Sequence, residues 1–142
     1  MFELDPHLQR DTVVLGDFPL CRLLLMNDRS YPWFILVPRR RGAREIHHLA
    51  TEDQQQLWRE SAELSRWIEQ NFSYDKLNVA ALGNIVSQLH LHHVARSIGD
   101  PAWPGPVWGA RPAVAYAAAE VIELRQLIQT GNLREFIFEC SD

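Results

Sequence analysis

The stretch of sequence that decides the fold reads Gln88-Leu89-His90-Leu91-His92-His93-Val94, and it holds three of the six histidines of the chain. Side chains of a β-strand point alternately to its two faces. The even-numbered residues of the stretch therefore share one face, and Leu89, Leu91 and His93 share the other. This alternation predicts a strand with its leucines in a core and with His90 and His92 beside a cleft.

Two imidazoles two residues apart on one face of a strand are compatible with three kinds of site. They can bind a metal ion through neutral ring nitrogens. They can carry out nucleophilic and acid–base chemistry, because histidine titrates near neutrality. They can also be a half-exposed pair without chemistry. The rest of the sequence has to distinguish these interpretations.

The segments around this stretch predict further strands, each a short apolar run bounded by turn residues. The expected strands are Val13–Leu15, Phe18–Met26, Phe34–Val37, Leu77–Leu82 and Gln88–Ala95. The first two form a hairpin that turns at Gly16-Asp17, and the third ends at Pro38. Because these strands are joined by short connections, we expect a mainly antiparallel sheet.

Two helices are expected beside this sheet. Thr51, with Gln54 three residues further on, predicts a capping box at the start of a helix that ends at Asn71. An alanine-rich stretch predicts a C-terminal helix over about 113–129, with Gly131 as its stop signal. Residues 99–112 contain four prolines and two tryptophans and are expected to form a loop. The pattern predicts one α+β domain over residues 1–142.

Composition and charge exclude several classes of protein. The 142 residues are 46% apolar and 23% charged, which is a globular composition. The net charge of −4 argues against coating nucleic acid by bulk charge. No apolar run approaches the ~20 residues that cross a bilayer, and no secretory signal is recognisable at the start. Cys21 and Cys140 suggest neither a metal-binding pair nor a disulfide framework, so a cytoplasmic location is expected.

The stretch from Leu77 to His92 resembles the paired strands of the histidine triad (HIT) superfamily of nucleotidyl hydrolases and transferases. That family's signature is three histidines alternating with apolar residues, and its middle histidine is the nucleophile. Asn78 and Asn84 stand where the family has an asparagine at the start of the first strand and an amide residue four positions before the triad. The resemblance covers residues 13–96, and it implies a HIT-like fold with a capped helix between strands and a C-terminal helix.

The resemblance also implies a reaction. His90 would attack the α-phosphorus of a nucleotide derivative and form a covalent nucleotidyl–histidine intermediate, which water or a second acceptor resolves. His92 would donate a proton to the leaving oxygen, since side chains at i and i+2 of a strand lie ~7 Å apart. Gln88 stands at the first triad position, where the family has histidine. An amide there can position a phosphate oxygen, but it cannot change charge with pH.

Further binding residues follow from the same resemblance. Asn27 stands where the family places a residue on the ribose hydroxyls, and Asn78, Asn84 and Ser87 are the other candidates for contacts with the nucleotide. The implied chemistry requires no cofactor and no metal. Members of the family are commonly homodimers whose sheets join, so a homodimer is expected.

Two alternatives to the enzyme remain at this stage. A HIT-fold module could bind a nucleotide with little or no turnover, and Gln88 is its support in the sequence. A metal protein could use His90, His92 or His93 with a carboxylate. No Asp or Glu stands at a recognisable ligand spacing from these histidines, so this alternative ranks last.

Overall fold

The computed structural model describes residues 1–139 of the chain and shows a six-stranded sheet in the order β4-β5-β3-β2-β1-β6. Every neighbouring pair of strands is antiparallel, which confirms the expected α+β fold. The elements are α1 (Pro6–Asp11), β1 (Thr12–Asp17), β2 (Cys21–Met26), β3 (Trp33–Pro38), the 3-10 helix η1 (Ile46–His48), α2 (Thr51–Asn71), β4 (Lys76–Ala80), β5 (Leu91–Arg96), α3 (Ala118–Thr130) and β6 (Ile137–Phe138). Cys140 lies outside the described residues.

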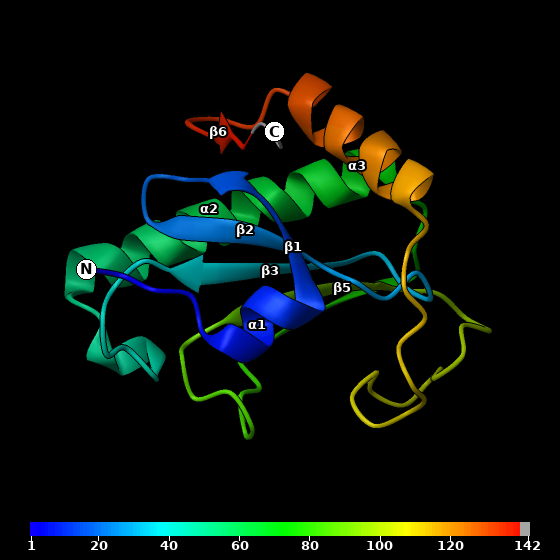
Figure 1. Ribbon diagram of the computed structural model, residues 1–142, viewed down its shortest axis with the longest axis horizontal. Helices are drawn as coiled ribbons and strands as arrows, with labels where there is room; N and C mark the ends of the chain where they lie inside the picture. The colour runs from blue at the N-terminus through cyan, green and yellow to red at the C-terminus, as the bar shows by residue number, and fades with distance from the viewer. Residues whose placement is uncertain (140–142) are drawn as a thin grey trace.

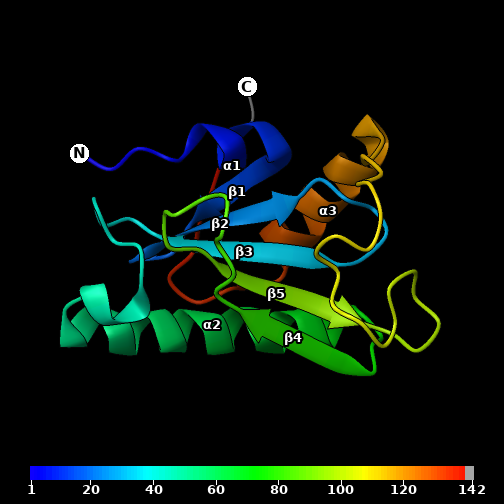
Figure 2. The same ribbon diagram turned by 90° about the horizontal axis from the view of Figure 1, so that it is seen from below.

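The two faces of the sheet are covered by different segments of the chain. Helix α2 lies along one face, and the N-terminal segment with α1 lies on the other (Figures 1 and 2). The main core forms between the sheet and α2, where Phe34, Leu57 and Leu64 are fully buried. A smaller core on the opposite face joins Leu8 of α1 to Trp33 of β3. The site described below lies beside it.

The hairpin at the start of the sheet differs from the expected one. Strand β1 continues through Gly16 and Asp17, and the chain turns at residues 18–20 instead. The register shifts between Val14 and Gly16, which marks a bulge in β1. The prediction of a turn at Gly16-Asp17 was wrong because this glycine has another role. A Cβ at Gly16 would collide with the backbone carbonyl of Ile137, where β6 pairs with β1.

Helix α2 has the expected bounds but not the expected cap. Its N-cap is Ala50, and Thr51 is its first helical residue, with no side-chain capping bond. The Nε2 of Gln54 donates instead to the carbonyl of Leu49 at 2.9 Å. The prediction of a capping box was therefore wrong by one residue. Thr51 stands one residue too late for its hydroxyl to accept a hydrogen bond from the N–H groups of the first turn.

The C-terminal helix starts later than expected. Residues 113–117 form no regular secondary structure, and α3 runs from Ala118 to Thr130, with the predicted stop, Gly131, as its C-cap. Their backbone is held by the connection between β2 and β3: Tyr116 N donates to Asn27 Oδ1 at 2.9 Å, and Arg29 N donates to the carbonyl of Val114 at 2.7 Å. Backbone groups bonded to another segment cannot form helical bonds, which explains the shift.

The connection between β4 and β5 matters most for the site. Strand β5 begins at Leu91, three residues later than expected, so residues 81–90 form a long loop on the α1 side of the sheet (Figure 2). The loop leads directly into His90. None of the helices among residues 1–139 is long and apolar enough to span a membrane.

Candidate functional site

A cavity of about 680 Å³ lies beside the triad segment on the α1 side of the sheet. Its walls come from α1, from the end of β2, from the loop after β4 and from the loop after β5. His90 and His92 line it together with Trp33 and Trp108. The rings of His90 and His92 approach edge to face, with centroids 4.8 Å apart. Four separate parts of the chain therefore converge on two histidines.

His90 is held in a single orientation by the backbone. Its Nδ1 lies 2.6 Å from the main-chain carbonyl oxygen of Gln88. A carbonyl oxygen only accepts hydrogen bonds, so Nδ1 carries the hydrogen and the neutral ring keeps its lone pair on Nε2. No residue between 1 and 139 forms a hydrogen bond with that Nε2. The residue is only 6% exposed and lines two adjacent cavities, and this geometry suits a nucleophile.

His92 has both ring nitrogens occupied. The indole Nε1 of Trp33 donates to its Nδ1 at 3.0 Å, and its Nε2 donates to the carbonyl of Leu82 at 3.1 Å. Burial, reinforced by the neighbouring His90, lowers the pKa of His92 to about 4. A neutral ring with no free nitrogen fits a structural support for His90, and it is poorly arranged for the proton donation expected from the sequence.

His93 points to the opposite face, as the alternation predicts. It is fully buried against α2, where its Nε2 lies 2.7 Å from the hydroxyl of Ser61 and its Nδ1 donates to the carbonyl of Leu91. Burial lowers its pKa to about 4. His93 is therefore a core residue that binds α2 to the sheet and takes no part in the cavity.

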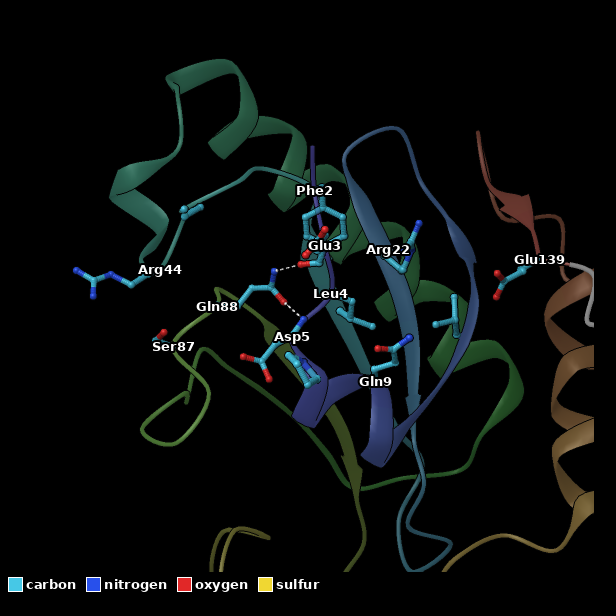
Figure 3. Close-up of a pocket in the computed structure, with 14 residues that line it drawn as sticks. Phe2, Glu3, Leu4, Asp5, Gln9, Arg22, Arg44, Ser87, Gln88 and Glu139 are labelled. Atoms are coloured by element: carbon cyan, nitrogen blue, oxygen red, sulfur yellow. Dashed lines mark hydrogen bonds between the residues drawn. The ribbon is translucent and has the colours of Figure 1, made fainter.

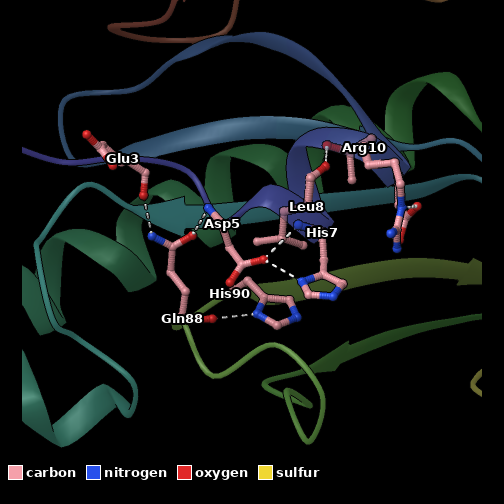
Figure 4. Close-up of polar contacts among 9 residues, drawn as sticks. Glu3, Asp5, His7, Leu8, Arg10, Gln88 and His90 are labelled. Carbon is pink, nitrogen blue, oxygen red and sulfur yellow. Dashed lines mark hydrogen bonds and ion pairs between the residues drawn. The ribbon is translucent and has the colours of Figure 1, made fainter.

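Gln88 uses its side chain away from the cavity of the histidines. Its Oε1 accepts from the backbone N–H of Asp5 at 2.9 Å, and its Nε2 donates to the carbonyl of Glu3 at 2.8 Å (Figures 3 and 4). The amide thus fastens the N-terminal segment to the triad. It also lines a separate cavity of about 740 Å³ that contains neither His90 nor His92 (Figure 3).

The other residues expected from the sequence are divided among different places. Asn27 and Asn84 line the cavity of the two histidines. Ser87 lies outside it and lines the two neighbouring cavities. Asn78 borders none of these three cavities, because its Oδ1 accepts from Nη1 of Arg96 at 3.1 Å on β5. The structure thus brings Asn27 and Asn84 to the histidines and leaves Asn78 apart.

Several residues of the site carry no recognisable signal in the sequence. Trp33 orients His92, and Trp108 packs edge to face on both Trp33 and His92, at centroid distances of 6.0 and 5.0 Å. His7 reaches the cavity from α1. Only the density of tryptophan near prolines pointed to the loop that holds Trp108. Among residues 1–139 the structure shows no group of three or more His, Cys, Asp or Glu side chains arranged to hold a metal ion.

Loop 99–112 is anchored by a buried ion pair. Arg96 donates through Nε and Nη2 to the two carboxylate oxygens of Asp100 at 2.8 and 2.9 Å. The same carboxylate accepts from the backbone N–H groups of Ser97, Ala102 and Trp103. The Arg96 guanidinium and these backbone donors lower the pKa of Asp100 to about 2. This anchor fixes the first half of the loop whose second half carries Trp108.

Comparison with known proteins identifies the architecture. The model of the HIT domain family matches residues 7–98. Comparison with curated proteins gave no match. A histidine triad protein from Marinobacter aquaeolei VT8, known from a crystal structure, is 50% identical, with a TM-score of 0.92 over 96% of this chain and 99% of that one.

Two further crystal structures are also similar to this chain. A histidine triad protein from Bradyrhizobium japonicum is 44% identical, with a TM-score of 0.88 over 90% of this chain and 96% of that one. A histidine triad (HIT) protein from Sinorhizobium meliloti 1021 is 41% identical, with a TM-score of 0.89 over 92% and 97% of the two chains. The family match covers more than half of the chain and includes His90 and His92. This chain belongs to the histidine triad (HIT) family.

Proposed function

We propose that this protein is a nucleotidyl hydrolase or transferase that acts at the α-phosphate of a nucleotide derivative. The observation that carries the proposal is the bond between His90 Nδ1 and the carbonyl of Gln88, which keeps the lone pair of the neutral ring on Nε2. Membership of the HIT family supports a nucleotide-type substrate. The chemistry uses the imidazole alone and needs no redox cofactor.

The proposed reaction has two steps. In the first, Nε2 of His90 bonds to the α-phosphorus, and the bond from phosphorus to the leaving atom breaks with its electron pair going to that atom. In the second, water or another acceptor attacks the phosphorus, and the electron pair of the P–N bond returns to Nε2. The carbonyl of Gln88 stabilises the positive charge that the ring carries in the intermediate, because Nδ1–H keeps donating to it.

The side chains around His90 suggest how the nucleotide is held. Asn27 and Asn84 offer neutral amide donors at the cavity, and Asn27 fits the ribose. Met26 and Val86 add apolar surface to the wall, which suits a base. Ser87 lies at the adjacent cavity of about 560 Å³, which His90 also lines, and it can contact a phosphate that extends in that direction.

A second candidate function is a nucleotide-binding module with little turnover. It is favoured by one specific observation: the side chain of Gln88 and both nitrogens of His92 are already bonded within the protein. Of the three positions of the triad, only His90 keeps a nitrogen without a partner among residues 1–139. Such a site can bind a nucleotide, but neither Gln88 nor His92 is free to donate a proton to the leaving group.

The deciding experiment compares the wild type with His90→Ala on nucleoside phosphoramidates, dinucleoside polyphosphates and nucleotide sugars. Released mononucleotide is measured by chromatography, and the acid-sensitive adduct on the protein by mass spectrometry after rapid quenching. Turnover and adduct in the wild type alone support the enzyme. A raised melting temperature without turnover supports the binding module. If the wild type shows neither turnover nor binding, both candidate functions are contradicted. His47→Gln changes an exposed histidine outside the cavities and is the matched control.

We also propose that the protein is a cytoplasmic homodimer. Strand β4 is the last strand of the sheet, and no strand within residues 1–139 covers its outer edge. Val79 on this strand is 40% exposed, and an apolar open edge can pair with a second copy. Light scattering should give twice the chain mass of 16.4 kDa for the wild type. Val79→Lys should lower the measured mass to that of a single chain. A monomeric wild type would contradict the dimer.

A further inference from the structure

We propose that His7, held by Asp5, is the proton donor for the leaving group in the reaction at His90. This inference rests on the proposed function. It concerns a residue that lies 83 positions before His90 in the sequence and outside the triad. The three observations that carry it are the shared cavity, the bonding of the two rings and the position of Gln88 between them.

His7 and His90 line the same cavity. His7 lies on α1, and its side chain is 52% exposed, so it faces both solvent and the space beside His90. Its Nδ1 lies 3.1 Å from Oδ1 of Asp5, and its backbone N–H donates to the same oxygen at 2.8 Å. The carboxylate oxygen accepts from Nδ1–H and therefore fixes the orientation of the ring. No residue from 1 to 139 forms a hydrogen bond with Nε2 of His7.

Gln88 connects this pair to the nucleophile. Its main-chain oxygen accepts from His90, and its side-chain Oε1 accepts from the backbone N–H of Asp5 (Figure 4). One residue thus sets the position of the nucleophilic ring and, through Asp5, the position of His7. The side chain at the first triad position acts as a positioning group for a histidine that comes from another part of the chain.

No other described group at the cavity fills this role as well. His92 has both nitrogens occupied and remains neutral, and Gln88 has no titratable group. Arg10 is bonded to both carboxylate oxygens of Asp11, Arg111 donates to the hydroxyl of Ser30, and Asp28 accepts from the backbone N–H groups of Ser30 and Val114. The charged and titratable side chains that share the cavity with His7 are Arg10, Asp11, Asp28, His90, His92 and Arg111.

The proton balance of the two steps closes with His7. While Nε2 of His90 bonds to phosphorus, protonated His7 gives its Nε2 proton to the departing oxygen or nitrogen. In the second step, neutral His7 takes a proton from the attacking water as the P–N bond breaks, and the lone pair returns to His90. The site ends in its initial state, and the products are the mononucleotide and the protonated leaving group.

The test compares two leaving groups on one nucleotide. A nucleoside phosphoramidate with an alkylamine leaving group needs the proton, whereas a 4-nitrophenyl ester of the same nucleotide leaves without it. His7→Gln should lower kcat/KM for the phosphoramidate by about 100-fold or more and for the nitrophenyl ester by only a few-fold. Asp5→Asn, which keeps the size of the side chain, should show the same selective loss to a smaller degree.

The controls separate this inference from the proposed function. His47→Gln removes an exposed histidine outside the cavities and should leave both substrates unaffected. Circular dichroism and the melting temperature show whether His7→Gln and Asp5→Asn remain folded. An equal loss of kcat/KM on both substrates, or no loss on either, overturns the role of His7 but leaves His90 as the proposed nucleophile. A wild type that forms no adduct on His90 overturns the proposed function, and the role of His7 with it.

Discussion

The indole N–H of Trp33 donates a 3.0 Å hydrogen bond to Nδ1 of His92, and both side chains are at least 95% buried. The bond fixes the tautomer of His92, because a ring nitrogen that accepts must be unprotonated. The hydrogen is therefore on Nε2, where it meets the carbonyl of Leu82. Trp33 in β3 thus controls which atom of a triad histidine faces the loop after β4.

Trp33→Phe tests this relationship, because it keeps an aromatic ring at the position but removes the donor together with part of the buried indole. Leaving Nδ1 of a buried imidazole without a partner should lower the free energy of unfolding by about 1–3 kcal/mol. Urea denaturation measures the loss, and ¹⁵N NMR of the imidazole should show a mixed tautomer of His92. Trp58→Phe changes a tryptophan that is 50% exposed on α2 and should alter neither quantity. An unchanged tautomer in Trp33→Phe would contradict the proposed control.

Stability should fall in mild acid because of His92 and His93. Burial lowers the pKa of each to about 4, whereas histidine in the unfolded chain titrates near 6.5. Between these values the unfolded state binds more protons, so the contribution is complete above pH 6.5 and is lost as the pH falls toward 4. Each histidine should account for on the order of 3 kcal/mol over that window.

Urea denaturation between pH 7.5 and pH 4.5 measures this dependence. His93→Leu should flatten the slope, because it removes one of the two groups that titrate differently in the folded and unfolded states. His47→Gln, on the surface, should leave the slope as it is. A flat profile in the wild type would show that the two rings are not held neutral.

Gly83→Ala should impair the site more than the fold. A Cβ at this position would collide with the carbonyl oxygen of Val86 and lie 3.1 Å from Cε1 of His90. The loop would have to shift, and with it the wall beside the nucleophile. We expect kcat/KM to fall about ten-fold, which corresponds to ~1.4 kcal/mol in the transition state. Gly105→Ala is the matched control, since its nearest contact is 3.2 Å and it lies outside the cavity.

Asp100→Asn should release the loop that carries Trp108. The substitution leaves the Arg96 guanidinium, only 1% exposed, without its counter-ion, and breaking such a buried pair costs about 3 kcal/mol. Because the folded pKa of Asp100 is lowered to about 2, the wild-type pair is intact above pH 4 and weakens as the pH falls toward 2. Limited proteolysis should cleave the variant within residues 97–112.

An exposed ion pair provides the control for Asp100→Asn. Asp53 on α2 binds Arg40 with both carboxylate oxygens, and Arg40 is about half exposed. Exposed pairs contribute less than about 1 kcal/mol, so Asp53→Asn should leave both stability and cleavage nearly unchanged. Equal effects of the two substitutions would show that Asp100 is not a special anchor.

The sequence indicated the fold and the triad because both depend on local periodicity. The alternation of apolar and polar residues around His90 gave the correct face for each histidine, and His93 lies on the core side as expected. Helix α1 was missed because its six residues are too few to show a helical period. Asp5 followed by Pro6 is nevertheless a helix-start signal, since aspartate caps the first turn and proline suits its first position.

The roles of individual side chains were harder to predict than their faces. The pattern places Gln88 on the face of His90, but its partners Glu3 and Asp5 come from the far N-terminal segment. Similarly, Asn78 lies on β4, just before the loop that holds Asn84 and Ser87, yet its side chain bonds to Arg96. Such choices depend on contacts between distant segments, which the spacing of residues along the chain does not reveal.

Two hydrogen bonds between distant segments near the site have consequences for folding kinetics. The bond from Asp5 to Gln88 spans 83 residues, and the bond from Tyr116 to Asn27 spans 89. Contacts between such distant residues require large loops to close, and they form late along a folding route. During refolding from urea, the helical signal of α2 should return before catalytic competence, so a nascent chain of this protein remains inactive until its two halves have met.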